Sequence, residues 1–444
     1  MPPEQLSEVG QRARRRIAKR ILPFLLLLYI IAFLDRVNVA YAGLVMSKDL
    51  GFSDRIFGLG AGIFFIGYVL LEIPGALIVE RWSARRWIAR IMISWGLVTV
   101  VVGFVHTTHQ FYLARFLLGA AEAGFFPGVI VYLTHWFRQE DRAKAIAAFM
   151  IGIPISSIVG SPVAGVILRL HWQGLAGWRW LFILEGIPAI ALGIITFFYL
   201  TDWPTQAHWL PPDEQQWIAA ELLREKQAKA SASCTIWQAV RRPSVIQLAM
   251  IYFLGDVGLY GFTMWFPTIL KRASGLPIFT VTLLGALPYL ATLAADLLVG
   301  WHSDHSGERR WHTALPLFAG GLTLLIGVAL PLPLWPELVF LISLAACVHC
   351  WQPSFWALPT TLLGESAAAA SIGLINSVGN LGGFAGPFII GYLGTRFHSF
   401  APGLAALLIC LFVAGFLVLT LRITLPTLAP DRSQGDGFSL RSKT

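Results

Sequence analysis

Residues 25–45 read LLLLYIIAFLDRVNVAYAGLV, and residues 111–133 read FYLARFLLGAAEAGFFPGVIVYL. At a rise of 1.5 Å per residue, either run can cross the ~30 Å hydrocarbon core of a bilayer as a helix. A charge at mid-bilayer costs at least about 2.5–3.5 kcal/mol, so it persists only opposite a partner or an aqueous cavity. We therefore expect the charged side chains in these runs to face a bundle interior: Asp35, Arg36, Arg115 and Glu122.

The whole chain has the composition of a membrane protein. Of its 444 residues, 56% are hydrophobic and only 13% are charged, too few charges to solvate an ordinary globule. Because lipid satisfies no backbone hydrogen bond, apolar spans are expected as helices. We predict an all-α membrane protein with twelve transmembrane helices, at about 21–45, 57–79, 88–105, 111–134, 145–168, 180–200, 246–270, 279–300, 312–331, 336–360, 369–393 and 402–421.

Basic residues are unevenly divided between the two sets of connecting segments. With the N-terminus inside, 24 of the 33 Lys and Arg residues fall in cytoplasmic segments and seven fall in outside loops. This asymmetry follows the positive-inside rule. It predicts that both termini are cytoplasmic, and it accounts for the net charge of +9 without nucleic acid as a partner.

The chain carries an internal repeat. Residues 80–87 read ERWSARRW and residues 304–311 read DHSGERRW, in equivalent places after the second and eighth spans. We predict two pseudo-symmetric six-helix halves, at 1–200 and 246–444, joined by a cytoplasmic linker at 201–245. The linker contains a predicted helix. We interpret it as part of the connection between the halves; the alternative is a helix that lies along the membrane surface.

The repeated loops resemble motif A of the major facilitator superfamily, Gly-x3-Asp-Arg/Lys-x-Gly-x-Arg-Arg/Lys. The second copy fits with the residues Gly300, Asp304, Gly307, Arg309 and Arg310. The first copy has Glu80 in place of Asp and Ser83 in place of Gly.

Within that superfamily the chain resembles the anion:cation symporter family of bacterial carboxylate carriers. The landmarks are Asp35-Arg36-x-Asn38, Arg115 through Pro127-Gly128, Trp209-Leu210, Tyr260-Gly261…Trp265-x-Pro267 and Asn376…Asn380-x-Gly382-Gly383…Pro387. The resemblance implies a monomer of the bacterial inner membrane that takes up an organic carboxylate, such as a sugar acid, tartrate or an aromatic acid. Transport would be coupled to H+ by alternating access, with no other cofactor.

The resemblance also implies roles for individual residues. Arg36 and Arg115 would engage the substrate carboxylate, and Asp35 and Glu122 would take up the proton. The chemistry agrees, because a guanidinium stays charged and grips a carboxylate with two hydrogen bonds. Ion pairs that only fix helix packing are the alternative. Further substrate contacts are implied at Tyr41, Tyr68, Asn376 and Asn380, for which packing within the bundle is the alternative reading.

Two groups of residues are expected to act away from the substrate. The motif A residues would brace the cytoplasmic gate: Glu80, Arg81, Arg85, Asp304 and Arg309. Asp256, near the start of the seventh span, is either a second titratable site or a solvated group at a helix end.

The same residues bear on other functions. An organic anion antiporter or uniporter of the same fold is the nearest alternative. A phosphate antiporter is disfavoured because its relatives carry an arginine in the seventh span, and here no basic residue lies between Val245 and Lys271. An enzyme would need a metal or nucleophile cluster, and the sequence suggests none. A sensor would need a signalling domain, and both tails are short.

Overall fold

The first six predicted spans all appear as helices in the computed structural model, which describes residues 3–229, 242–330, 333–363 and 365–421. The fourth and fifth spans are each divided into two consecutive helices. In chain order the helices are α1 (Pro3–Asp49), α2 (Asp54–Arg81), α3 (Ala84–Val102), α4 (Thr108–Glu122), α5 (Phe125–Thr134), α6 (Gln139–Met150), α7 (Gly152–Ile167) and α8 (Gly177–Tyr199).

A short 3-10 turn and one helix follow, and the last six spans come after them. The eighth and tenth spans are divided in the same way as the fourth and fifth. The elements are η1 (Pro204–Gln206), α9 (Pro212–Lys229), α11 (Pro243–Ser274), α12 (Ile278–Leu284), α13 (Ala286–Ser306), α14 (Arg310–Ala329), α15 (Leu334–Cys350), α16 (Gln352–Leu363), α17 (Glu365–Phe397) and α18 (Ala401–Thr420).

The all-α prediction is confirmed, and each predicted span has its helix. Ten helices or helix pairs among the described residues are long and apolar enough to cross a membrane. The other two predicted positions are filled by α3, which has three arginines near its start, and by the glycine-rich α17.

A proline explains where each divided span breaks. Pro127, Pro154, Pro288 and Pro353 lie at the second or third residue of α5, α7, α13 and α16 respectively. A proline ring clashes with the carbonyl four residues earlier and has no N–H to donate, but both defects are tolerated in the first turn of a helix. The chain therefore ends one helix and starts the next at these points.

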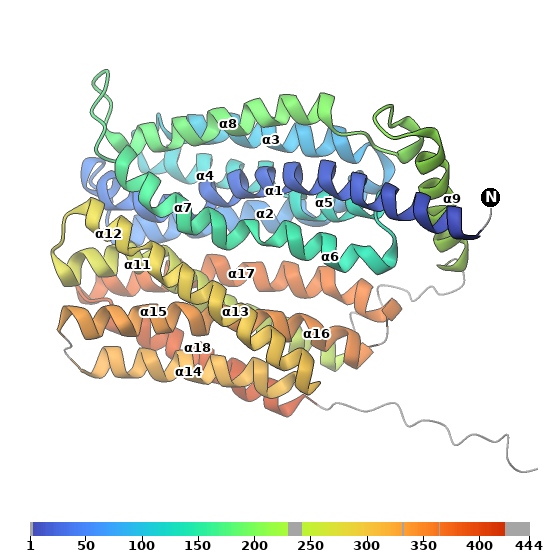
Figure 1. Ribbon diagram of the computed structural model, residues 1–444. Helices are drawn as coiled ribbons and strands as arrows, with labels where there is room; N and C mark the ends of the chain where they lie inside the picture. Colours follow the sequence, from blue (N-terminus) through green and yellow to red (C-terminus); the bar gives the residue numbers. More distant parts are fainter. Residues whose placement is uncertain (1–2, 230–241, 331–332, 364, 422–444) are drawn as a thin grey trace, which may run out of the picture.

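The two halves lie side by side along their length. Figure 1 shows the blue-to-green helices α1 to α8 on one side and the yellow-to-red helices α11 to α18 on the other. The N-terminus and α9 lie at one end of the bundle, called here the α9 end, and α12 lies at the opposite end, called here the α12 end.

Helices α2 and α17 form the seam between the halves. At the α12 end, the guanidinium of Arg272, on the neighbouring α11, donates two hydrogen bonds to Asp54 of α2, at 2.8 and 2.6 Å. Further along, the positions of Gly58 and Gly62 face α17 backbone so closely that a Cβ would meet the Pro387 and Phe384 carbonyl oxygens at 2.5 and 2.7 Å. Small residues at such a contact let two helix backbones approach.

We expect Gly58→Val to force α2 away from α17. The added side chain would occupy space now filled by the Pro387 carbonyl oxygen, so the α12 end should open. Spin labels at positions 55 and 398, which are exposed on opposite halves at this end, would report a longer distance. The matched control is Gly327→Val, because a Cβ there meets nothing within 4 Å. Equal distances in the two variants would contradict the role assigned to this seam.

The helix of the predicted linker packs on protein through its apolar side. Ile218 of α9 is buried, and Trp217 lies directly against Gly10 of α1. Ion pairs join α9 to α1, from Arg16 to Glu214 at 3.0 Å, and to the start of α6, from Arg138 to Glu221 at 3.4 Å. The helix α9 therefore packs against the N-terminal part of α1, in agreement with a connecting role.

Candidate functional site

Arg36 of α1 and Glu122 of α4 form an ion pair inside the bundle. Their side chains are 12% and 3% exposed, so the pair is largely removed from solvent. The second carboxylate oxygen, Glu122 Oε2, has no hydrogen-bond partner among the described residues, and neither has Arg36 Nε. The pair thus retains capacity for a further donor and a further acceptor.

The position of Glu122 follows from the break in the fourth span. Glu122 is the last residue of α4, and Gly124 then turns the chain with a φ of 83°. A side chain at Gly124 would be strained at that φ and would also crowd Gly75 of α2. A carboxylate at the C-terminal end of a helix faces the negative end of the helix dipole, so its stability here depends on Arg36.

Aromatic rings from both halves surround the Arg36 guanidinium. Its carbon lies 4.9 Å from the Phe33 ring centroid and 5.4 Å from that of Tyr68. Tyr260, on α11 of the other half, also interacts with Arg36 through its hydroxyl, and its ring packs against Phe65 at 4.5 Å. The ion pair therefore faces the junction between the halves.

Asp35 and Arg115, also expected at the site, lie inside the N-terminal half. Asp35 accepts hydrogen bonds from Trp95 Nε1 at 2.7 Å and Thr99 Oγ1 at 3.1 Å, both on α3. Arg115 Nε donates to the Gly60 carbonyl at 3.4 Å. The structure pairs Arg36 with Glu122, whereas Asp35 and Arg115 bond to other residues of the N-terminal half.

Arg115 is nevertheless close to the ion pair. Its guanidinium carbon lies 4.9 Å from the Phe64 centroid, and that of Arg36 lies 5.5 Å from the same centroid. Arg115 Nη1 has no hydrogen-bond partner among the described residues, although it is buried. The Phe64 ring thus contacts both guanidiniums.

Sequence reasoning missed two further glutamates at membrane depth. Glu72 of α2 accepts hydrogen bonds from Asn376 Nδ2 at 2.5 Å and Ser377 Oγ at 3.2 Å, both on α17. Glu185 of α8 accepts a hydrogen bond from Asn38 Nδ2 of α1. Each interrupts an apolar run, YVLLEIPG or LFILEGIPA, so the cost of a charge in lipid was a signal that could have found both.

The remaining expected contacts are dispersed. Asn376 is engaged by Glu72, whereas Asn380 is buried one turn further along α17. Tyr41 is fully buried where α1 meets α7 and α12, with its hydroxyl beside Ser161. Asp256 is buried and accepts a hydrogen bond from Gln352 at 3.4 Å, so it is not a solvated group at a helix end.

The first motif A copy caps a helix. The side chains of Glu80 and Arg81 lie outside the described residues. The Arg85 amide and the Ser83 hydroxyl both donate to Asp202, at 2.9 and 2.6 Å. Asp202, which follows α8, thereby holds the start of α3.

The second copy is internally paired. Arg309 contacts Asp304 at 2.6 Å and Ser303 Oγ at 2.9 Å. Glu308 accepts hydrogen bonds from the Trp311 and His312 amides at the start of α14. Partial burial opposes ionisation of Glu308, but these amides and the His312 ring hold its pKa below the usual value. The cap therefore stays ionised below the ordinary titration range of glutamate.

We expect Asp202→Ala to destabilise the protein by about 1–3 kcal/mol, because two donors near the start of α3 lose their acceptor. The melting temperature in detergent should fall by several degrees. Asp213→Ala removes only the more exposed pair with Arg12 and should change it little. Equal melting temperatures for the two variants would contradict the capping role.

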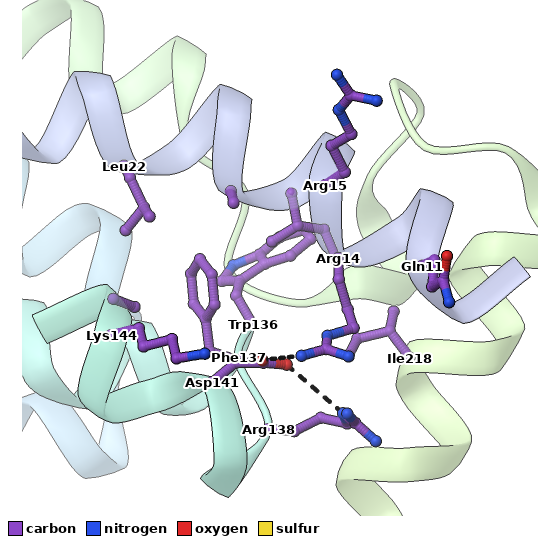
Figure 2. A pocket seen from close by; sticks show the side chains of 13 residues that line it. Gln11, Arg14, Arg15, Leu22, Trp136, Phe137, Arg138, Asp141, Lys144 and Ile218 are labelled. Atoms are coloured by element: carbon purple, nitrogen blue, oxygen red, sulfur yellow. Dashed lines mark hydrogen bonds and ion pairs between the residues drawn. The ribbon is translucent and has the colours of Figure 1, made fainter. Parts of the chain in front are cut away.

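A cavity of about 360 Å³ lies at the α9 end between α1, α6 and α9. Figure 2 shows Arg14 and Arg138 both directed at Asp141, with Trp136 beside them. Arg36 lies about six helical turns further along α1 than Arg14, roughly 33 Å at 1.5 Å per residue. This cavity is therefore separate from the Arg36–Glu122 pair.

The comparison with protein families identifies the fold. A family model described as Major Facilitator Superfamily matches residues 25–387. The chain belongs to the major facilitator superfamily. The resemblance drawn from the repeated loops is confirmed, and so is the predicted architecture of twelve helices in two halves.

Two curated relatives extend over nearly the whole chain. A protein of Agrobacterium vitis named "Putative tartrate transporter" is 45% identical, over 94% of this chain and 95% of its own length. A protein of Pseudomonas putida named "Putative metabolite transport protein NicT" is 40% identical, over 91% of this chain and 93% of its own length. This superfamily member is therefore a multi-pass membrane transporter of a small molecule and not an enzyme.

A solved structure supports the fold independently. It is a bacterial homologue of the human lysosomal transporter Spinster in an inward-facing, unoccupied conformation. Its TM-score with this superfamily member is 0.73 at 18% identity, covering 92% of this chain and 95% of the other. At that identity the likeness concerns the fold alone.

Proposed function

We propose that this protein takes up an organic carboxylate anion together with H+, by alternating access in the bacterial inner membrane. The observation that carries the proposal is the buried Arg36–Glu122 pair, facing Tyr260 across the junction between the halves. The superfamily places small-molecule transport on this chain, and the relatives named for tartrate and metabolite transport support an organic acid as substrate.

The pair suits exchange between substrate and proton. A substrate carboxylate entering between the halves competes with Glu122 for the Arg36 guanidinium. Arginine favours this role because its planar fork binds a carboxylate with two hydrogen bonds. Glu122, released from its partner in a low-dielectric site, then binds a proton, because an unpaired buried charge is costly. Substrate and proton enter together, and the loaded site is left with one ion pair.

Asp35 and Arg115 support this exchange from inside the N-terminal half. Arg115 and Arg36 contact the same Phe64 ring, so Arg115 adds a second positive charge close to the pair. Asp35, held by Trp95 and Thr99, balances that charge within the N-terminal half. We infer that Glu122 is the primary proton site and that Asp35 sets the field in which it titrates.

The positive-inside count supports placing the α9 end in the cytoplasm. With that orientation, the hydrogen bonds between α2 and α17 run from the periplasmic end, where the Arg55 amide donates to Thr395, to Glu72. A closed periplasmic side corresponds to the inward-facing state of an alternating-access carrier. Substrate release to the cytoplasm is the step that this arrangement favours.

Uptake into proteoliposomes tests the proposal. Labelled tartrate, an aldonate, nicotinate and hydroxyphenylacetate would be offered with an inward proton gradient and, as the control, with a protonophore added. We expect at least one carboxylate to accumulate and the protonophore to abolish accumulation. Uptake of a neutral polyol, with no uptake of any carboxylate, would overturn the substrate class. Gradient-independent counterflow without net accumulation would replace symport by antiport or uniport.

A further inference from the structure

We propose that Glu72 is a proton-binding residue that couples the protonation state to the contact between the two halves. This proposal rests on the alternating access proposed above but not on the identity of the substrate. Glu72 is 5% exposed and lies on α2, while both of its hydrogen-bond donors, Asn376 and Ser377, lie on α17. Its carboxylate thus bridges the halves at membrane depth.

Ionised Glu72 fits these two donors. Each carboxylate oxygen accepts one hydrogen bond, from an amide on one side and a hydroxyl on the other. Moving α2 away from α17 would remove both donors from a buried carboxylate, which is expensive in a low-dielectric setting. A protonated Glu72 has no charge to strand, so the same separation costs less. Proton binding and opening of the seam are therefore thermodynamically linked.

The charged and titratable groups around Glu72 come from its own helix and from two others. Tyr68 lies one turn earlier on α2, Arg36 acts on Glu72 from α1, and Tyr252 faces it from α11. The positive charge of Arg36 favours the ionised form of Glu72, although Arg36 is also paired with Glu122. Binding of a substrate anion to Arg36 would weaken that support and thereby promote proton uptake at Glu72.

The chain contains a matched pair that does not cross the seam. Asn38 of α1 donates to Glu185 of α8, the same two residue types, with both helices in the N-terminal half. Neutralising Glu185 changes the charge of a membrane-depth glutamate without touching the contact between α2 and α17. Any general effect of removing such a charge appears in both variants, and an effect on the seam appears only in Glu72→Gln.

The test measures opening directly, without substrate. The four native cysteines are changed to serine, and spin labels are placed at positions 55 and 398. Distance distributions are recorded at pH 8 and pH 5.5 in the parent, in Glu72→Gln and in Glu185→Gln. We expect acid to raise the ratio of long to short distances about 10-fold in the parent, equivalent to one unit of difference in pKa between the two states.

Glu72→Gln should show a raised long-distance population already at pH 8 and a pH response at least about 3-fold smaller than the parent. Glu185→Gln should follow the parent. Identical behaviour of Glu72→Gln and the parent, or of Glu72→Gln and Glu185→Gln, would overturn the proposal. If Glu72→Gln does not fold, the double variant Asn376→Ala/Ser377→Ala decides: unchanged distances at pH 8 reject the bridge. Failure of carboxylate uptake would leave this result standing, because no substrate is added.

Discussion

Replacement of Arg36 by alanine should abolish carboxylate uptake. The variant removes the guanidinium that is proposed to bind substrate, and it leaves Glu122 buried without its partner. Truncating one partner of a buried, hydrogen-bonded charge pair at a binding site costs about 2–5 kcal/mol, which corresponds to a loss of at least about 30-fold in kcat/KM. Initial rates in proteoliposomes, normalised to the amount of monodisperse protein, measure the effect.

Arg36→Lys distinguishes the contribution of the planar guanidinium from that of the positive charge alone. Lysine keeps the positive charge but presents one ammonium in place of a planar fork, so bidentate binding of a carboxylate is lost. We expect uptake to fall by about 10-fold or more while the melting temperature stays near that of the parent. Full activity in Arg36→Lys would show that a point charge suffices and would contradict a two-pronged grip.

A double variant distinguishes function from folding. Arg36→Gln/Glu122→Gln replaces the ion pair by two amides that can bond each other, so neither position keeps a buried charge. We expect its stability to exceed that of Arg36→Ala, with no uptake in either. Recovery of uptake in the double variant would mean that the ion pair serves packing only, which is the alternative raised from the sequence.

The sequence predicted which side chains matter better than how they pair. The cost of a charge in lipid singled out Arg36 and Glu122 correctly as residues of the interior. It could not give their pairing, because that depends on the rotation of α1 and on the break at Gly124. Nor could it give the partner of Arg115, because the Gly60 carbonyl to which Arg115 donates lies on another helix.

The omissions have a different physical origin. Glu72 and Glu185 satisfy the same rule as Asp35, but their partners come from helices distant in sequence, so no local pattern indicates their role. Helix α9 illustrates the same limit. Its apolar side suited either lipid or protein, and the Trp217–Gly10 contact with α1 decided the matter.

Glu122→Gln should uncouple substrate binding from the proton. In the parent, ionised Glu122 competes with the substrate anion for Arg36, so affinity should weaken as the pH rises and strengthen as it falls. Glutamine cannot ionise, and Arg36 is then available at every pH. We expect substrate affinity in the variant to be independent of pH and, at pH 8, about 10-fold tighter than in the parent, within the usual range of coupling energies.

The same change should remove active accumulation. Because no proton is released when the substrate leaves, a proton gradient can no longer drive net uptake by Glu122→Gln, whereas counterflow of labelled substrate should persist. Glu185→Gln is the matched control, since Glu185 bonds Asn38 away from Arg36 and should retain gradient-driven uptake. Gradient-driven accumulation by Glu122→Gln would move the proton site to another carboxylate. In that case Glu72, on which the same Arg36 acts from within the N-terminal half, is the residue to substitute next.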